Sequence, residues 1–250
     1  MNRAHSALSL SAIALIALAT LALAGCHNAP TNTASNVPTS AFPTATTTPA
    51  PTTSIQPATQ SPSPPAPDRP LILCFGDSLT AGFGTDPGQS YPDALQHLLD
   101  AAGYRYHVVN DGISGNTTKD GLDRIQRVLA RHPQIVVVEF GGNDGLRGLP
   151  LEQTQANLST IIAQLQSSGA KVVLAGITLP PSYGPDYIKK FNAMYPALAK
   201  QYHVPFLPFI LQNVYGVPGD MQPDDTHATA QGNQQVARNI ESLLHPLLKR

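Results

Sequence analysis

Hydrophobic and polar positions follow two different periods along most of this chain. Short apolar runs predict β-strands over five segments: Leu71–Phe75, His107–Asn110, Ile135–Phe140, Val172–Ile177 and Val204–Pro208. Amphipathic stretches predict helices over five others: Tyr91–Ala102, Gly121–Arg131, Leu151–Ser168, Asp186–Gln201 and Thr229–Leu248. Strands and helices therefore alternate, which is typical of a parallel sheet with helices on its faces.

The strand segments are continuously apolar rather than alternating, which indicates strands that are buried on both faces of the sheet. We therefore expect residues 70–250 to form one α/β domain, a three-layer αβα sandwich around a central five-stranded parallel sheet. Ligands of such sheets bind beyond the carboxyl ends of the strands. The residues that directly follow each strand should therefore carry the chemistry.

The first 25 residues have a different pattern, which predicts an export signal. Arg3 supplies a positive charge, and Ala7–Ala24 is apolar except for two serines and a threonine. The sequence Leu-Ala-Gly-Cys at 23–26 resembles the lipobox of bacterial lipoproteins, which implies cleavage before Cys26 and acyl chains attached to it. The alternative is an uncleaved signal anchor. Both interpretations predict an exported, membrane-tethered protein on the periplasmic or cell-surface side, and His27 slightly favours an outer membrane.

Residues 26–69 predict a disordered tether. The stretch is composed mainly of Pro, Thr, Ser and Ala, and only Asp68 and Arg69 are charged. It has too few large apolar side chains to offset the entropy cost of ordering. Repeated proline favours extended polyproline II, with a reach of roughly 130 Å at about 3.1 Å per residue. Ser and Thr beside Pro are also compatible with a glycosylated stalk.

Composition narrows the class of protein further. The formal net charge is −1, with 12% charged residues, so no basic surface for nucleic acid is expected. The 2 cysteines cannot form a disulfide scaffold or a four-cysteine zinc site. Cys74 lies within the first predicted strand, where it is most simply a small buried hydrophobe.

Ser78 follows the first predicted strand in the sequence Phe75-Gly-Asp-Ser-Leu-Thr80. A serine where a strand turns into a helix presents its hydroxyl at the sheet edge, and its N–H can face developing negative charge. We expect Gly76 to give this turn its backbone freedom. The alternative is a simple helix N-cap at Asp77 or Ser78. The other common nucleophile motif, G-x-S-x-G, is absent.

Two further loops carry weaker signals when each is taken alone. Gly115 follows the second strand, where a glycine can direct its N–H at a ligand. Asn143 follows the third strand in Gly141-Gly-Asn-Asp144, where its side-chain amide can donate to an oxyanion. Both segments are also compatible with ordinary turns.

Asp224 and His227 lie just before the last predicted helix. With this spacing one short loop carries a base and the residue that orients it: the imidazole can accept the Ser78 proton while Asp224 fixes its tautomer. The alternatives are a solvated loop, an N-cap at Asp225 or a metal site, although the neighbouring residues add no clear third ligand.

Together these segments resemble the SGNH (GDSL) hydrolase superfamily, over essentially all of residues 70–250. The resemblance is closest to a bacterial periplasmic subgroup of thioesterases, arylesterases and lysophospholipases, on the stretches 141–149, 179–184 and 195–209. It implies a flavodoxin-like fold and an acyl-enzyme mechanism without metal or cofactor. The implied triad is Ser78, His227 and Asp224, and the implied oxyanion donors are the N–H groups of Ser78 and Gly115 and the side chain of Asn143.

The chain departs from the family pattern at Ala228, where the family often has proline, and in its long tether. The first departure could loosen the histidine loop, and the second leaves the natural substrate open. We expect an apolar lip for acyl chains at 145–150, carried by Leu146 and Leu149, with Tyr183 and Tyr187 lining the same groove. An ordinary strand-to-helix connection is the alternative for 145–150.

The expected substrate is a small acyl ester or thioester, hydrolysed by a monomer that is attached to a membrane through Cys26 and binds no nucleic acid. Two other functions stay open on the sequence. One is a carbohydrate acetylesterase, which the tether also suits. The other is a surface-displayed binding module that has lost activity, although Ser78, Asp224 and His227 are all present.

Overall fold

The computed structural model describes residues 69–250. The predicted export signal, the lipidation site Cys26 and the tether up to residue 68 lie outside the described residues and stay predictions. No helix within the described part of the chain is long and apolar enough to cross a membrane.

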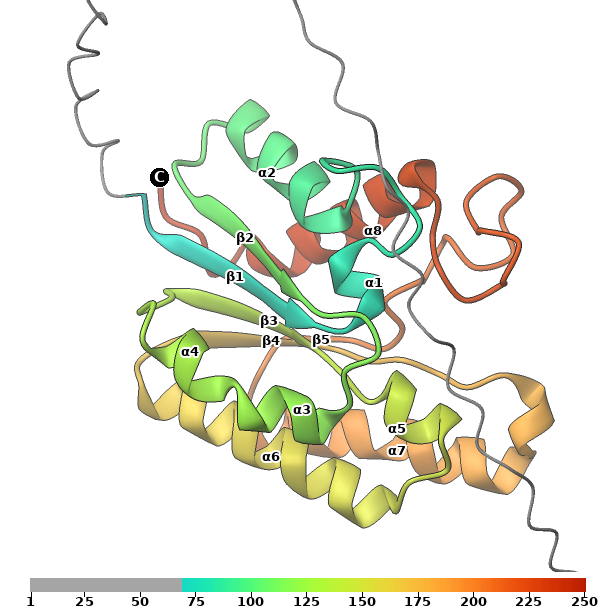
Figure 1. The fold of residues 1–250 in the computed structure, drawn as a ribbon. Coiled ribbons are helices and arrows are strands. Elements are labelled where there is room, and N and C mark those ends of the chain that lie inside the picture. The colour runs from blue at the N-terminus through green and yellow to red at the C-terminus, as the bar shows by residue number, and fades with distance from the viewer. Residues whose placement is uncertain (1–68) are drawn as a thin grey trace, which may run out of the picture. The chain divides into compact units, whose positions relative to one another are not determined.

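Five parallel strands form the central sheet, as predicted (Figure 1). Their order is β2-β1-β3-β4-β5, and their bounds are β1 Leu71–Gly76, β2 His107–Gly112, β3 Ile135–Glu139, β4 Lys171–Ala175 and β5 Phe206–Leu207. The chain order reverses between β1 and β3, which run side by side. This switch point is where open α/β sheets bind their ligands.

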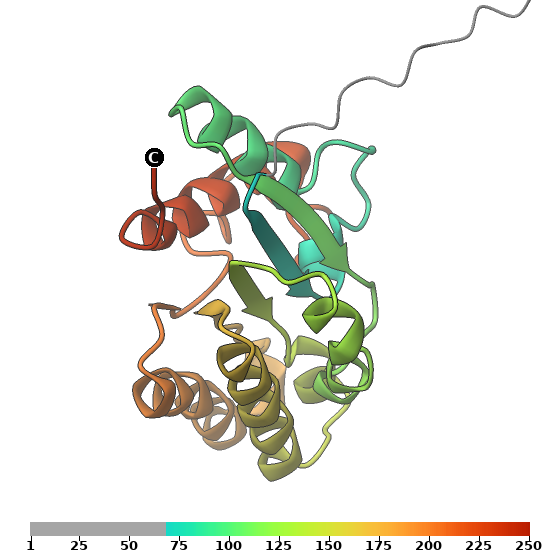
Figure 2. The same ribbon diagram turned by 90° about the vertical axis from the view of Figure 1, so that its left-hand side faces the viewer.

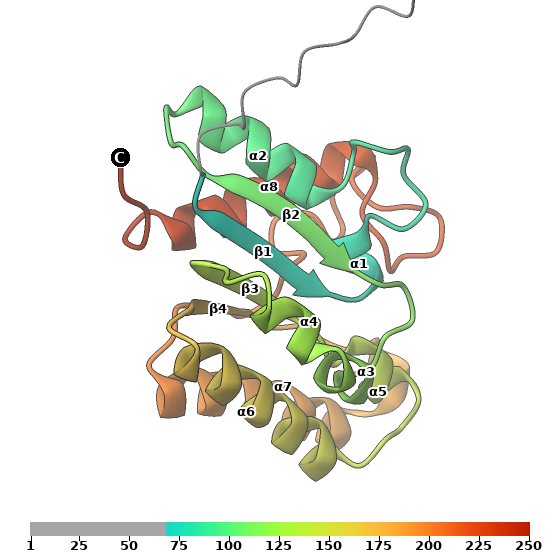
Figure 3. The same cartoon turned by 60° about the vertical axis from the view of Figure 1, so that its left-hand side comes forward.

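Helices cover both faces of the sheet, so the three-layer prediction is confirmed. In Figure 1 and, turned, in Figures 2 and 3, α2 and α8 lie on one face, and α3, α4, α6 and α7 lie on the other. The helix bounds are α1 Ser78–Ala81, α2 Tyr91–Ala101, α3 Thr118–Asp123, α4 Ile125–Leu129, α5 Gly142–Leu146, α6 Leu151–Ser167, α7 Pro185–Tyr202 and α8 Ala230–Leu244, with a 3₁₀ turn at Pro181–Tyr183.

Burial explains why the strands were predictable. Every residue of β3 is buried, and so is every residue of β1 except Leu71. Cys74 is fully buried in β1, and burial raises the pKa of its thiol to about 12. The expectation of a small buried hydrophobe at this position is confirmed.

Two elements differ from the sequence prediction. The single helix expected over 121–131 is divided into α3 and α4 at Arg124, whose φ of −103° and ψ of 6° leave the helical region. The edge strand β5 has 2 residues rather than the predicted five. Pro205 and Pro208 flank it, and a proline has no N–H to donate to a neighbouring strand.

The described chain enters the domain at the amino end of β1. Arg69 precedes this strand and forms an ion pair of 2.9 Å with Asp100, near the end of α2. In Figure 3, β1 runs from this end of the sheet to α1 at the other. The start of the domain and the residues that follow the strands thus lie at opposite edges of the sheet.

Candidate active site

Ser78 occupies a sharp turn between β1 and α1. Gly76 ends the strand, Asp77 caps the helix by accepting a hydrogen bond from the Leu79 N–H at 3.0 Å, and Ser78 is the first helical residue. The expected reason for Gly76 is wrong, because its φ is not positive. A Cβ at Gly76 would instead collide with Thr80 Oγ1 and Glu139 Oε2, so the glycine is needed for close packing under the turn.

Ser78, His227 and Asp224 form one chain of hydrogen bonds. Ser78 Oγ lies 2.8 Å from His227 Nε2, and His227 Nδ1 lies 2.6 Å from Asp224 Oδ2. Asp224 Oδ1 accepts from the backbone N–H groups of Thr226 and His227, each at 3.0 Å. Residues 149 positions apart are thus brought into the arrangement that a serine nucleophile requires.

The hydrogen bonds of Asp224 keep it ionised. Burial acts to raise its pKa, but the hydrogen bond with the His227 ring and the two backbone N–H groups together lower the pKa below its ordinary value. An ionised Asp224 accepts a hydrogen bond from the Nδ1–H group, which keeps the ring proton on Nδ1 and leaves Nε2 of the neutral ring free to act as a base towards Ser78.

Gln222 holds the loop that carries Asp224 and His227, a role that no sequence signal indicated. Its side-chain amide donates to the carbonyls of Phe83 at 2.6 Å and Ala228 at 2.8 Å, and its backbone N–H donates to the His227 carbonyl at 2.8 Å. Ala228 also forms an antiparallel bridge with Met221. Alanine in place of proline at 228 therefore leaves this loop well held, contrary to the concern that it would be loose.

The predicted oxyanion residues Gly115 and Asn143 lie on loops that contact the turn carrying Ser78. Asn143 Nδ2 lies 3.1 Å from Asp77 Oδ2 and 3.1 Å from the Asn116 carbonyl oxygen. Gly115 has a φ of +81°, and its carbonyl accepts a hydrogen bond of 2.8 Å from Arg147. Its N–H makes no backbone hydrogen bond among residues 69–250. The Ser78 N–H opens α1 and so has no acceptor within that helix.

We expect Asn143→Ala to lower kcat for ester hydrolysis by about 10²–10³-fold, the usual effect of removing one oxyanion donor. KM should change little, because the amide gains its strongest contact only when charge develops on the carbonyl oxygen. The measurement is steady-state kinetics on a p-nitrophenyl ester, with circular dichroism as the folding control. An unchanged kcat would remove Asn143 from the site.

Asp144 holds α5, the helix that carries Asn143, in place, and sequence reasoning missed this role. It is 2% exposed and accepts hydrogen bonds from the N–H of Thr118 at 2.9 Å and from the hydroxyls of Thr118 at 2.5 Å and Thr154 at 3.3 Å. It therefore ties α5, which carries Asn143, to α3 and α6.

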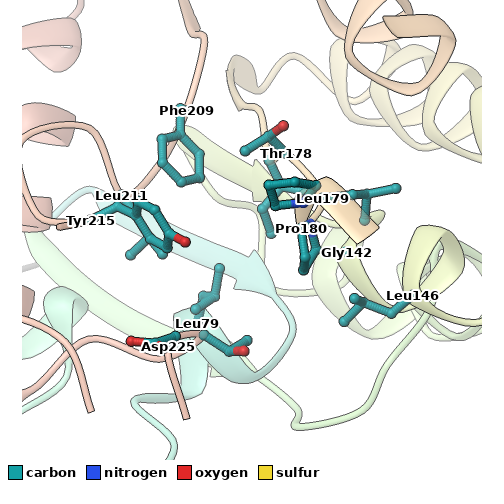
Figure 4. A pocket seen from close by; sticks show the side chains of 13 residues that line it. Leu79, Gly142, Leu146, Thr178, Leu179, Pro180, Phe209, Leu211, Tyr215 and Asp225 are labelled. Carbon is teal, nitrogen blue, oxygen red and sulfur yellow. The ribbon is translucent and has the colours of Figure 1, made fainter. Parts of the chain in front are cut away.

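A largely apolar cavity of about 250 Å³ opens beside the triad (Figure 4). Leu79 beside Ser78, Gly142 beside Asn143 and Thr226 beside His227 form its inner end. The rest of its wall comes mainly from the segments that follow β4 and β5, including Ile177, Leu179, Pro180, Phe209, Leu211 and Tyr215.

The residues expected to contact substrate differ in their relation to this cavity, and their contact with substrate stays a prediction. Leu146 lines the cavity, but Leu149 and Tyr183 do not. The Tyr183 hydroxyl instead donates to the Leu146 carbonyl at 2.8 Å, and Tyr187 approaches the Leu149 carbonyl at 3.5 Å. The two tyrosines, one from the 3₁₀ turn and one from α7, therefore hold the 145–150 segment through its backbone carbonyls.

The metal-site alternative finds no ligand set in the described residues. Within 69–250 no group of three or more His, Cys, Asp and Glu side chains is arranged to hold a metal ion. Asp224 and His227 are directed at each other and at Ser78 instead.

A 2-1-3-4-5 parallel sheet with these side chains at its carboxyl edge defines the SGNH class of hydrolase folds. The chain belongs to the GDSL-like lipase/acylhydrolase family, whose sequence model matches residues 74–235. The resemblance inferred from the motifs is thereby confirmed.

Three relatives illustrate the similarity. Esterase TesA of Pseudomonas aeruginosa is 44% identical over 178 residues, covering 71% of this chain and 89% of the relative. Thioesterase 1/protease 1/lysophospholipase L1 of Escherichia coli is 39% identical, covering 71% and 84%. The crystal structure of the psychrotrophic esterase EstA from Pseudoalteromonas, inhibited by monoethylphosphonate, has a TM-score of 0.67 at 29% identity, covering 71% and 97%. The prediction of a GDSL-type ester hydrolase is confirmed by this kinship.

Proposed function

We propose that the domain hydrolyses acyl esters and thioesters through a covalent acyl-enzyme formed on Ser78. The observation that carries the proposal is the hydrogen-bonded chain from Ser78 Oγ to His227 Nε2 and from His227 Nδ1 to Asp224. Inhibition of the similar esterase EstA by a phosphonate is consistent with a nucleophilic residue in a site of this architecture.

In the first step Ser78 Oγ attacks the acyl carbonyl carbon while His227 Nε2 accepts the hydroxyl proton. The developing oxyanion is met by the N–H groups of Ser78 and Gly115. Asn143 keeps one amide hydrogen on Asp77, and its other hydrogen exchanges the Asn116 carbonyl for the oxyanion. His227 then gives its proton to the leaving alcohol or thiol.

The second step reverses these roles with water as the nucleophile. His227 removes a proton from water, which attacks the acyl carbon, and the proton returns to Ser78 Oγ as the carboxylic acid leaves. Asp224 stabilises the imidazolium that forms in each step, because its negative carboxylate accepts a hydrogen bond from Nδ1–H throughout.

The surroundings of the triad favour a substrate with an apolar acyl chain. The cavity wall is mostly aliphatic and aromatic. The large apolar side chains that stay more than a third exposed also follow the carboxyl ends of strands; in the described part of the chain they are Phe83, Ile113, Leu146, Leu149, Tyr215 and Val217. Each methylene buried here would add about 0.8 kcal/mol of binding. The relatives named thioesterase and lysophospholipase suit this chemistry.

The test is a series of p-nitrophenyl esters from acetyl to palmitoyl, hydrolysed by residues 69–250 with Ser78→Ala as the blank. We expect kcat/KM to rise from acetyl to medium-length chains, after which acyl-CoA and lysophospholipid are assayed. A sharp preference for the acetyl ester would contradict an apolar acyl chain and would favour the carbohydrate acetylesterase alternative. If Ser78→Ala hydrolysed every ester as fast as the unchanged domain, the proposed function would fail and the binding-module alternative would be favoured.

We expect Tyr215→Ser to lower kcat/KM for an octanoyl ester about tenfold and to leave the acetyl ester unchanged. Tyr215 is 56% exposed and lines the cavity, so the change shortens an apolar wall without opening the core. Burial of part of a ring against an acyl chain accounts for about 1–2 kcal/mol. Val217→Ser is the matched control, because Val217 is 40% exposed and lies outside the cavity. Equal effects of the two variants would contradict an acyl chain in this cavity.

A further inference from the structure

Two acidic side chains lie buried directly beneath the nucleophile, and the mechanism above uses neither as an acid or base. Asp77 is 2% exposed and precedes Ser78; Glu139 is fully buried and ends β3. Glu139 lies next to Gly76 in the sheet register, so its carboxyl packs under the turn that carries Ser78.

The four carboxyl oxygens have unequal partners. Asp77 Oδ1 accepts from the Leu79 N–H at 3.0 Å, and Oδ2 accepts from the Asn143 amide at 3.1 Å. Glu139 Oε2 accepts from the Thr80 hydroxyl at 2.8 Å and from the Asp77 N–H at 3.3 Å. Glu139 Oε1 is buried and finds no N–H or O–H donor within 69–250.

No positive charge in the described structure forms an ion pair with either carboxyl. The titratable groups that face Glu139 are Asp77 itself, Tyr91 from α2 and Tyr195 from α7, and the pKa values of both phenols are raised well above the ordinary value by burial. The charge of His227 acts to lower the pKa of Asp77, but less than burial raises it. Two buried carboxylates without a cation cannot both be charged, so the pair holds a proton.

The hydrogen bonds place that proton on Glu139. Both oxygens of Asp77 accept N–H groups, which favours its ionised form. Glu139 Oε1 has no donor within 69–250, and the Glu139 and Asp77 side chains are close enough to share a hydrogen bond. The pKa values agree in direction. Burial raises the pKa of Asp77 to about 6, and burial together with the Asp77 charge raises the pKa of Glu139 well above its ordinary value.

We propose that Glu139 is a positioning residue that stays protonated in the folded enzyme and, through Asp77, holds the Asn143 amide in place for the oxyanion. A neutral Glu139 leaves the negative charge on Asp77, which accepts one Asn143 hydrogen and fixes the plane of the amide. Glu139 touches no substrate; it acts by holding Asp77 and the first turn of α1. The inference rests on the proposed role of Asn143 in hydrolysis.

The kinetic test is made on residues 69–250 and compares two replacements of Glu139 whose side chains are of similar size. Glu139→Gln keeps a neutral polar group that can donate to Asp77 and accept from Thr80, so kcat and KM should stay within about threefold of wild type. Glu139→Leu removes these hydrogen bonds, and kcat should fall about 10- to 100-fold with KM within about twofold, a smaller loss than that of Asn143 itself. Equal losses in kcat for the two variants would mean that a charged carboxylate is needed, and would overturn the proposal.

A second test detects the proton on Glu139 through the pH dependence of folding stability, so it does not depend on catalysis. Stability against urea is measured for Glu139→Gln and its parent from pH 6.5 to 8.5, both in the Ser78→Ala background. Because the folded pKa of Glu139 is raised, its stabilising effect is complete below the unfolded value and is lost as pH rises. The parent should therefore lose stability relative to Glu139→Gln over this range. A constant difference would show Glu139 ionised in the folded state and would overturn the proposal.

These two tests separate the inference from the proposed function. If no variant of the chain shows Ser78-dependent hydrolysis, the proposed function fails, and the urea measurement still decides the protonation of Glu139. If hydrolysis is confirmed but the urea difference is constant, only the inference fails. If Glu139→Leu does not fold, the Glu139→Gln kinetics and the urea measurement decide.

Discussion

Replacing Ser78 with alanine is expected to lower kcat for ester hydrolysis by at least about 10⁴-fold. The hydroxyl lies 2.8 Å from His227 Nε2, and without it no acyl-enzyme can form. The free energy of unfolding should be nearly unchanged, because the Ser78 side chain does not cap a helix and is only half-buried. The measurement is initial rate on the best p-nitrophenyl ester, together with thermal unfolding to show that the domain is intact.

Ser182→Ala is the matched control for this change. Ser182 is an exposed serine in the 3₁₀ turn at Pro181–Tyr183, and no hydrogen bond links it to the triad. Its replacement should leave the rate unchanged. Wild-type activity in a folded Ser78→Ala enzyme would show that the hydrogen-bonded chain is not the catalytic centre.

Asp224→Asn is expected to lower kcat by about 10⁴-fold, although Asp224 is 42% exposed in its side chain. The amide oxygen can still accept from the N–H groups of Thr226 and His227, so the loop should keep its shape. The amide nitrogen then faces His227 Nδ1 as a donor. Nδ1 must accept, the ring proton moves to Nε2, and Nε2 can no longer take the Ser78 proton.

The neighbouring acid provides the control for this second change. Asp225 has a φ of +52°, a conformation that asparagine tolerates as well as aspartate, and it has no bond to His227. Asp225→Asn should keep nearly full activity in the same assay. A small, equal effect for both variants would mean that the exposed Asp224 does not orient the histidine.

The sequence predicts the sheet well because buried parallel strands are continuous apolar runs rich in Val, Ile and Leu; β3 is a nearly pure example, and β1 adds Cys and Phe to Leu and Ile. It predicts the edge strand poorly, because β5 pairs only with β4 and has proline on both sides. The break at Arg124 was also hidden. This arginine turns inward to Asp111 at 2.6 Å and stacks over Phe75, contacts that depend on the folded sheet.

The proposed catalytic residues were predictable because they stand in short sequence motifs. The residues that hold them in place were not predictable, because their contacts join distant parts of the chain. Ser78, Asn143 and His227 each follow a strand or precede the last helix in a recognisable motif. Gln222 and the cavity residues that follow β4 and β5 have no such pattern, because their contacts join segments far apart in the chain. Glu139 carried a signal that was passed over: it is an acid at the end of the otherwise apolar run Ile-Val-Val-Val.

The ion pair of Arg69 with Asp100 gives the domain an attachment point as well as a boundary. The six residues of β1, at about 3.3 Å per residue, separate this point from Ser78 by roughly 20 Å across the sheet. A chromatography bead or sensor chip attached directly at residue 69 through a short linker would therefore lie at the sheet edge opposite Ser78. Immobilised in this way, the enzyme would present its site to the solution, and kcat/KM for a dissolved ester should stay close to that of the free enzyme.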